Sequence, residues 1–147
     1  MSHVRTQIRE VMAAVLADAL GSGYNVYASR KYPRNLGTSA LVDMRFQNEN
    51  IDPVTMGDLR TRTASLYIRC QRGAVEATID DLLDADEIAI SDAIEAYEWG
   101  DLLTEYPELV QVNWTDDATS GTVIGGIVMR YDLEYRATTT DFETARD

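Results

Sequence analysis

Cysteine and histidine are almost missing from this sequence. Its 147 residues include one cysteine, Cys70, and one histidine, His3. A single cysteine excludes an internal disulfide framework and a zinc site built from cysteines, and a single histidine disfavours catalysis that depends on this residue. Cys70 lies on the apolar face of a predicted strand, which favours a buried, unreactive thiol. His3 is next to the N-terminus and is expected to be exposed and without a role.

Long apolar runs are missing as well. The longest stretch without charge, Ala118–Met129, is too short and too polar to span a membrane. The N-terminal segment carries Glu10 and Asp18, and it lacks the basic start, apolar block and cleavage site of a signal peptide. We therefore expect a protein that is made inside the cell and has no membrane association.

Lysine and arginine are missing from the middle of the chain. Residues 73–129 contain fourteen acidic residues and no basic one, a net charge of −14, whereas residues 1–72 contain ten basic and six acidic residues, a net charge of +4. The simplest interpretation is a solvated acidic helix face. The segregation also suits head-to-tail assembly, in which the basic part of one subunit meets the acidic part of the next. Binding of the acidic segment to nucleic acid is disfavoured, because phosphates repel it.

Hydrophobic periodicity predicts two helical regions. The first begins at a suitable N-cap, Ser2, and ends at Gly21 and Gly23. Its apolar stripe is Val4, Ile8, Val11, Met12, Val15, Leu16 and Ala19. The second region, Ala74–Trp99, is one long helix or two consecutive helices, with Ser91 as the cap of the second.

Alternating apolar and polar residues predict the strands. They are Asn25–Ala28, Ser39–Phe46, Leu59–Gln71, Leu109–Trp114 and Thr122–Arg136. Gln47–Asp58 is expected to be a long polar loop, Thr115–Gly121 a turn, and Ala137–Asp147 a polar tail. We therefore predict a single α+β domain over residues 1–136. It is a mostly antiparallel sheet of four to five strands, with two main helices packed on one face.

The sequence contains few patterns that are typical of a catalytic or metal-binding site. The acidic run between Asp80 and Glu87 lacks the glycine and the ligand spacing of a calcium loop. Trp99 and Trp114 are expected in the core or at an interface, and the core is favoured. The basic segment around Arg30 and Arg34 is expected to be a solvated or subunit-contacting loop. We predict no enzymatic activity, no catalytic residue, no metal and no cofactor. By elimination, a binding or assembly role is the favoured interpretation.

The order of these elements resembles the tail terminator family of long-tailed bacteriophages, the proteins like minor tail protein U. Members also occur in prophages and gene transfer agents. The resemblance begins with the helix IREVMAAVLADAL and covers nearly the whole chain. It continues through Ala40–Asp52, Arg62–Arg72, the acidic helix ATIDDLLDADEIAISDAIEA and the final strand Thr122–Tyr135. It lies in architecture rather than in a residue signature.

The resemblance implies a structural virion protein at the neck of the tail, assembled in the bacterial cytoplasm. Such a protein forms a homohexameric ring that caps the last ring of tail tube protein and stops polymerisation. Its opposite face meets the head-completion protein, and DNA passes through the lumen without specific binding. An acidic lumen suits that passage, because attraction to phosphates would slow the exit of DNA.

Two sets of residues are candidates for these contacts. Exposed loops carry recognition, so the tube-facing candidate is the start of the polar loop, namely Gln47, Asn48, Glu49, Asn50, Ile51 and Asp52. The lateral ring contact is assigned to arginines from the basic part and carboxylates from the acidic part, namely Arg60, Arg62, Arg69, Arg72, Asp80, Asp84 and Glu87. For the arginines, ordinary strand solubility is an equally good interpretation.

Other functions stay open at this point. A head-completion or neck connector protein is a close structural rival, distinguished by binding the portal side rather than the tube. An acidic inhibitor that mimics DNA is a second alternative, and it would place carboxylates in two rows on one surface. An enzyme whose site the sequence does not reveal is a third, and it would need a deep pocket with perturbed carboxylates.

Overall fold

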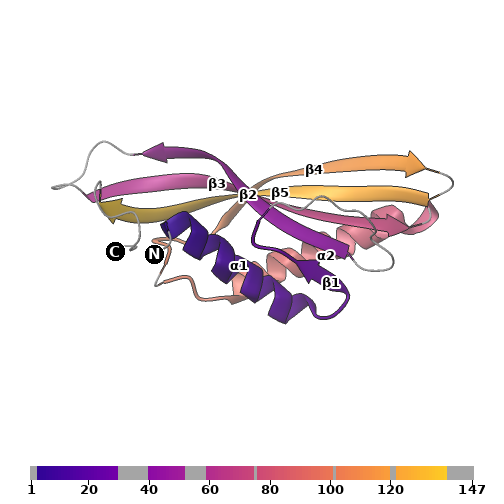
Figure 1. Cartoon of the computed structure of the whole chain (residues 1–147), viewed down its shortest axis with the longest axis horizontal. Helices are drawn as coiled ribbons and strands as arrows, with labels where there is room; N and C mark the ends of the chain where they lie inside the picture. The colour runs from indigo at the N-terminus through magenta and orange to yellow at the C-terminus, as the bar shows by residue number, and fades with distance from the viewer. Residues whose placement is uncertain are drawn as a thin grey trace.

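The computed structural model describes residues 3–29, 40–51, 59–74, 76–100, 102–119 and 122–138. Two helices and five strands follow one another along the chain (Figure 1). They are α1 (Val4–Leu20), β1 (Tyr24–Val26), β2 (Ala40–Ile51), β3 (Leu59–Ala74), α2 (Glu76–Ala96), β4 (Glu108–Thr119) and β5 (Thr122–Thr138). The predicted α+β class is confirmed.

The five strands form one sheet in the order β1-β2-β3-β5-β4. Only the short β1 runs parallel to its neighbour β2, and every other pair is antiparallel. β3 and β5 pair continuously from Leu59 opposite Thr138 to Ala74 opposite Val123. The β2 end and the β4 end of the sheet project in opposite directions beyond its middle (Figure 1).

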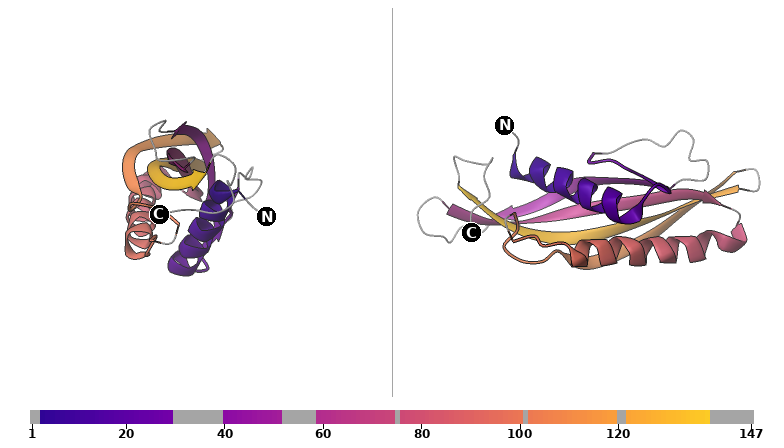
Figure 2. Two further views of the ribbon diagram at one scale, coloured as in Figure 1. Left: turned by 90° about the vertical axis from the view of Figure 1, so that its left-hand side faces the viewer. Right: turned by 90° about the horizontal axis from the view of Figure 1, so that it is seen from below.

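Both helices cover the same face of the sheet (Figure 2). α1 buries a stripe at a spacing of four residues, and the alternating positions of β3 and β5 face it across one continuous core. Fully buried members of that core include Ile8, Met12, Leu16, Met44, Leu66, Ile68, Ile90, Ile94, Ile127 and Met129. The alternating apolar positions of the last strand, from Ile127 to Tyr135, are all buried.

Several predicted boundaries are wrong. β2 continues through Ile51, so the first part of the predicted loop belongs to a strand, and Thr115–Thr119 belong to β4 rather than to a turn. Pairing with β3 and β5 extends these strands despite their polar sequence. α2 is one continuous helix, in which the Ser91 hydroxyl donates to the Glu87 carbonyl instead of capping a second helix. The basic segment 30–39, the rest of the predicted loop at 52–58 and most of the tail lie outside the described residues.

Gly125 on β5 permits close packing of α2 against the sheet. A Cβ atom at this position would lie 2.6 Å from Cγ1 of Ile79 and 3.0 Å from Cδ1 of Leu83, both on α2. These distances are shorter than van der Waals contact, so any larger residue must displace the helix or its side chains.

We therefore expect Gly125→Val to lower the free energy of unfolding by about 1–3 kcal/mol through overpacking. Gly100→Ala is the matched control, because no atom lies within 4 Å of a Cβ built there. Urea unfolding measures both variants. Equal stability of the two would contradict the close approach of α2 to β5.

Candidate assembly surfaces

The predicted tube-facing residues lie on the far part of β2. Gln47–Ile51 extend this strand beyond a register shift between Phe46 and Asn48, and Asp52 lies outside the described residues. Gln47, Asn48, Asn50 and Ile51 are exposed, and the Ile51 side chain is 49% exposed. The segment is therefore a strand end rather than a loop, and it still presents polar groups and one apolar group at its surface.

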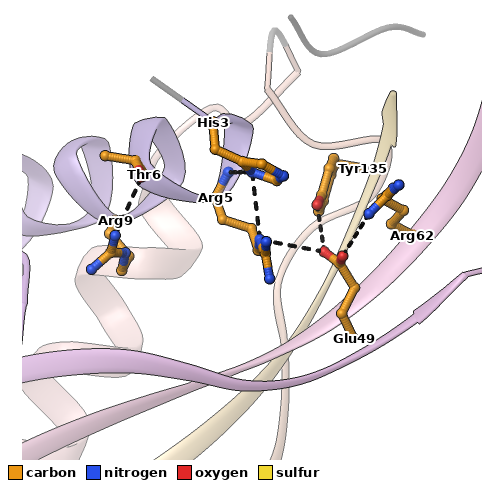
Figure 3. A network of polar contacts seen from close by, with 7 residues as sticks. All are labelled: His3, Arg5, Thr6, Arg9, Glu49, Arg62 and Tyr135. Carbon is orange, nitrogen blue, oxygen red and sulfur yellow. Dashed lines mark hydrogen bonds and ion pairs between the residues drawn. The ribbon is translucent and has the colours of Figure 1, made fainter. Parts of the chain in front are cut away.

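Glu49 is the exception in this segment, because its carboxylate points towards the core side of the sheet (Figure 3). Arg62 on β3 donates to its Oε2 atom at 2.8 Å, and the Tyr135 hydroxyl donates to its Oε1 atom. Arg62 is only 7% exposed. Burial, and then the hydrogen bond to Glu49, raise the pKa of Tyr135. Glu49 and Arg62 thus belong to an internal network.

A second predicted lateral arginine is also engaged within the chain. Arg69 on β3 holds the buried Asp43 of β2 through two hydrogen bonds, from Nε at 2.9 Å and from Nη2 at 2.5 Å. The pair lies on the face of the sheet away from the helices, where a fork of two donors neutralises a buried carboxylate. The side chain of the fourth candidate, Arg60, is outside the described part of the structure.

Arg72 reaches the most deeply buried acid of the acidic helix. Its Nε and Nη2 atoms donate to the two carboxylate oxygens of Asp86 at 2.8 and 2.7 Å. Tyr24 on β1 donates its hydroxyl to the same carboxylate at 2.5 Å, and Cys70 Sγ lies 3.6 Å from it. Asp86 is 1% exposed. One carboxylate therefore ties α2 to β3 and β1.

The electrostatics of this cluster follow from burial. Burial, and then the hydrogen bond to Asp86, raise the pKa of Tyr24 to about 12. Cys70 is buried, which confirms that part of the prediction. Burial, and then the charge of Asp86, raise the pKa of its thiol. The hydrogen bond to Asp86 raises the pKa of Arg72.

Arg62 is therefore buried, and Arg69 and Arg72 expose less charge than their residue type suggests. The lateral ring contact assigned to these arginines stays a prediction. Each of the three holds a carboxylate of its own chain, and the Arg72 side chain is only 14% exposed. Residue types cannot reveal these ion pairs, because the partners lie 13 to 26 positions away in sequence. The acidic candidates for the lateral contact are more accessible: Asp80 and Asp84 are exposed, and Glu87 is half-buried.

A basic pocket that the sequence analysis missed lies between α1 and β2. It encloses about 530 Å³ and is lined by His3, Arg5, Thr6, Arg9, Ser29, Met44, Arg45 and Phe46. Arg9 donates only to neutral oxygens, at 3.3 and 3.4 Å, and Arg45 stacks over the Tyr67 ring with its Cζ atom 5.7 Å from the ring centre. In the described part of the chain, no salt bridge includes Arg9 or Arg45. Spacing alone could have suggested Arg5 and Arg9, which lie one helical turn apart.

His3 has a structural role at the edge of this pocket. It replaces the predicted Ser2 as the N-cap of α1, and its Nδ1 atom accepts a hydrogen bond from the Arg5 backbone N–H at 3.0 Å. The expectation of an exposed, idle histidine is wrong. Burial, and then the positive charge of Arg5, lower the pKa of His3.

The two tryptophans have opposite environments. Trp99 is 2% exposed and donates its indole N–H to the Ile94 carbonyl, which confirms its predicted core position. Trp114 is 60% exposed, so the favoured core position is wrong for this residue, and the interface position stays a prediction. It lies on β4, an edge strand with a neighbour on one side only, beside a hollow of about 180 Å³ formed with Ile79, Asp80, Leu83, Thr115 and Gly125.

In comparison with known proteins, no family model and no curated protein matches the chain. Within the described residues, neither helix has the length and apolar character needed to cross a membrane. The same residues contain no group of three or more histidine, cysteine or acidic side chains arranged to hold a metal ion.

Removing the carboxylate of Asp86 should be strongly destabilising. Asp86→Ala leaves the Arg72 guanidinium and the Tyr24 hydroxyl without their acceptor, so we expect a loss of about 3 kcal/mol or more in the free energy of unfolding. The exposed Asp84→Ala is the matched control and should change it by less than about 0.5 kcal/mol. Urea unfolding distinguishes the two. A second variant, Asp86→Leu with Arg72→Met, should be more stable than Asp86→Ala, and the opposite order would contradict a paired-charge role.

His3 should make stability depend on pH near neutrality. A lowered pKa in the folded state means that the unfolded chain binds the proton more readily, so stability falls as the pH drops through about 6.5 towards the folded-state value. His3→Asn keeps an N-cap acceptor but does not titrate, and it should flatten the pH dependence of urea unfolding between about pH 7 and 5.5. An unchanged slope in this variant would show that other groups cause it.

Proposed function

We propose that this protein is a structural virion protein that assembles into a ring, homohexameric by family resemblance, at the end of a phage-type tail tube. The ring stops tube polymerisation and forms the interface to the head-completion or neck protein. The protein acts by self-association and docking, without enzymatic chemistry or a cofactor. Its site of action is the neck region of the tail, and DNA passes through the ring.

The observation that carries this proposal is the separation of opposite charges on one small chain. The basic pocket opens on the side of α1 that faces away from α2, because the groove between the two helices is lined by other residues, including Val11, Val15 and Ala93. Many of the exposed carboxylates, among them Asp81, Asp84 and Asp92, lie on α2. Two unlike surfaces on one subunit support head-to-tail association, which closes into a ring when the rotation between subunits allows it.

Unlike ends of the sheet support the second part of the proposal. A tube cap must bind the tube on one side and the neck on the other. The end of β2 presents Gln47, Asn48, Asn50 and Ile51. Trp114 is exposed on β4, which extends towards the opposite end of the sheet (Figure 1), and it lies beside a hollow lined by both apolar and polar residues. Exposed aromatic and aliphatic side chains with polar surroundings are typical of binding surfaces.

The acidic charge is consistent with a lumen that lets DNA pass. The whole chain has a net charge of −12, so a ring of several copies repels phosphates instead of retaining them. A strongly negative chain is also what an inhibitor that mimics DNA requires, so this class of protein stays an alternative. A DNA mimic needs two rows of carboxylates on one surface, and the exposed carboxylates of α2 supply one row along a single helix.

Tube capping can be tested directly with tail tube protein from the same source. We expect a substoichiometric amount of this protein to stop tube elongation, measured by light scattering, and to leave ring-shaped density at tube ends in negative-stain images. Ile51→Ser should weaken tube binding, because it removes the exposed apolar group at the β2 end, whereas Tyr106→Ser, at another exposed aromatic residue, should not. Unchanged elongation without density at tube ends would overturn the proposal, and binding only to head or neck particles would favour a neck connector.

A further inference from the structure

The hollow between α2 and the edge strand β4 brings an exposed indole ring next to a carboxylate. Trp114 pairs with the buried Ile127 of β5, and opposite residues of an antiparallel pair project from the same face, so the indole lies on the face that the helices cover. From α2, Ile79 and Leu83 line the hollow with apolar surface, and Asp80 lines it with a carboxylate. An exposed tryptophan beside a cavity is typical of an interaction hot spot.

The negative charge at this hollow is not neutralised within the described chain. Asp80 and Asp84 lie four residues apart on α2, so they are neighbours on one side of the helix, and both are exposed. Among the described residues, no salt bridge includes either carboxylate, and no arginine is stacked over the Trp114 ring. Residues 73–129 contain no lysine or arginine that could supply a local counter-charge. The hollow therefore attracts a cation from outside the chain.

We propose that this hollow binds an arginine side chain of a partner protein, with the guanidinium group stacked on Trp114 and paired with Asp80. An indole face attracts a cation, and the planar guanidinium group can stack on a ring while its N–H groups donate to a carboxylate. The apolar surface of the hollow suits the methylene groups of the arginine side chain. This inference goes beyond the proposed function, because the recognition of arginine does not depend on ring formation.

A different protein matches this site better than a second copy of the chain. Most arginines that the structure describes are engaged within their own chain. Those paired with a carboxylate are Arg5, Arg62, Arg69, Arg72 and Arg130, and Arg45 is stacked over the Tyr67 ring. Nucleic acid is also a poor match, because its phosphates would meet the carboxylates of α2. The partner is therefore a protein with arginine at its contact surface.

Two peptides that differ only in charge test the site. One has the sequence Leu-Arg-Gly-Leu-Arg-Gly, and in the other citrulline replaces both arginines, which removes the charge and keeps the shape of the side chain. Both have blocked ends and a neutral dye, and fluorescence anisotropy at low salt measures their binding to the natural chain. We expect the arginine peptide to bind at least about tenfold more tightly than the citrulline peptide. A lysine version should bind about threefold more weakly than the arginine peptide.

Substitutions test whether the peptide binds at this hollow. Trp114→Leu keeps an apolar side chain without an aromatic face, and Asp80→Asn keeps the shape of the side chain without its charge. Each should weaken binding of the arginine peptide at least about fivefold. Tyr106→Leu and Glu105→Gln are the matched controls, because they remove an exposed aromatic ring and an exposed carboxylate before β4 begins. They should leave binding within about twofold of the natural chain.

Tryptophan fluorescence gives a second readout that needs no substitution. Trp114 is exposed and Trp99 is buried, so acrylamide quenches the emission of Trp114 preferentially. The unlabelled arginine peptide should protect the natural chain from this quenching, and the citrulline peptide should not. Circular dichroism checks that the variants fold, and the quenching experiment decides the matter if Trp114→Leu or Asp80→Asn does not.

The inference is overturned if the arginine peptide does not bind at millimolar concentration, if the two peptides bind alike, or if Trp114→Leu and Asp80→Asn bind like the natural chain. Loss of self-association in Trp114→Leu, without binding of the peptide to the natural chain, would also overturn it, because the occupant would then be a second copy. Tube capping judges the proposed function separately. A chain that binds the arginine peptide but does not cap tubes keeps this inference and loses the proposed function.

Discussion

The structure depends on one buried carboxylate, that of Asp86. Removing a charge from water costs several kcal/mol, and here two hydrogen bonds from Arg72 and one from Tyr24 offset that cost. The three residues come from α2, β3 and β1, so the cluster fixes how α2 is rotated on the sheet. With Asp86 facing inwards, the carboxylates half a turn away must face solvent. This cluster and the buried apolar side chains of α2, including Leu83, Ile90 and Ile94, together direct the exposed carboxylates of the helix towards solvent.

Internal pairing also determines where positive charge remains. Three arginines of β3 are held by carboxylates of the same chain, at Glu49, Asp43 and Asp86. Arg9, beside the pocket between α1 and β2, and Arg45, stacked over the Tyr67 ring, have no salt bridge within the described residues. Among the basic residues that the structure describes in the first half of the sequence, Arg62, Arg69 and Arg72 are therefore paired with carboxylates of the same chain, whereas Arg9 is not. A charged surface for assembly arises from what the fold leaves unpaired.

The shape of the sheet explains how a small protein can have several different contact surfaces. β3 and β5 form a continuous central ladder, while β2 and β4 extend past it at opposite ends. Helices cover one face, so exposed apolar groups such as Ile51, Ile88 and Trp114 are distributed over separate regions. Separate regions suit a subunit that must contact copies of itself and two unlike neighbours, which is the role proposed for this protein.

Local pattern alone determined the fold class, both helices and the buried faces of the long strands, because burial repeats every three to four residues in a helix and every two in a strand. The buried stripe from Val4 to Leu16 and the buried alternation from Ile127 to Tyr135 can be recognised in the sequence without knowing which elements pack against them. The tertiary structure decided which charges are internal, why Gln47–Ile51 is a strand and why Trp114 is exposed. These properties depend on neighbours distant in the chain: an ion pair needs both partners in place, and a polar strand forms only when another strand supplies its hydrogen bonds.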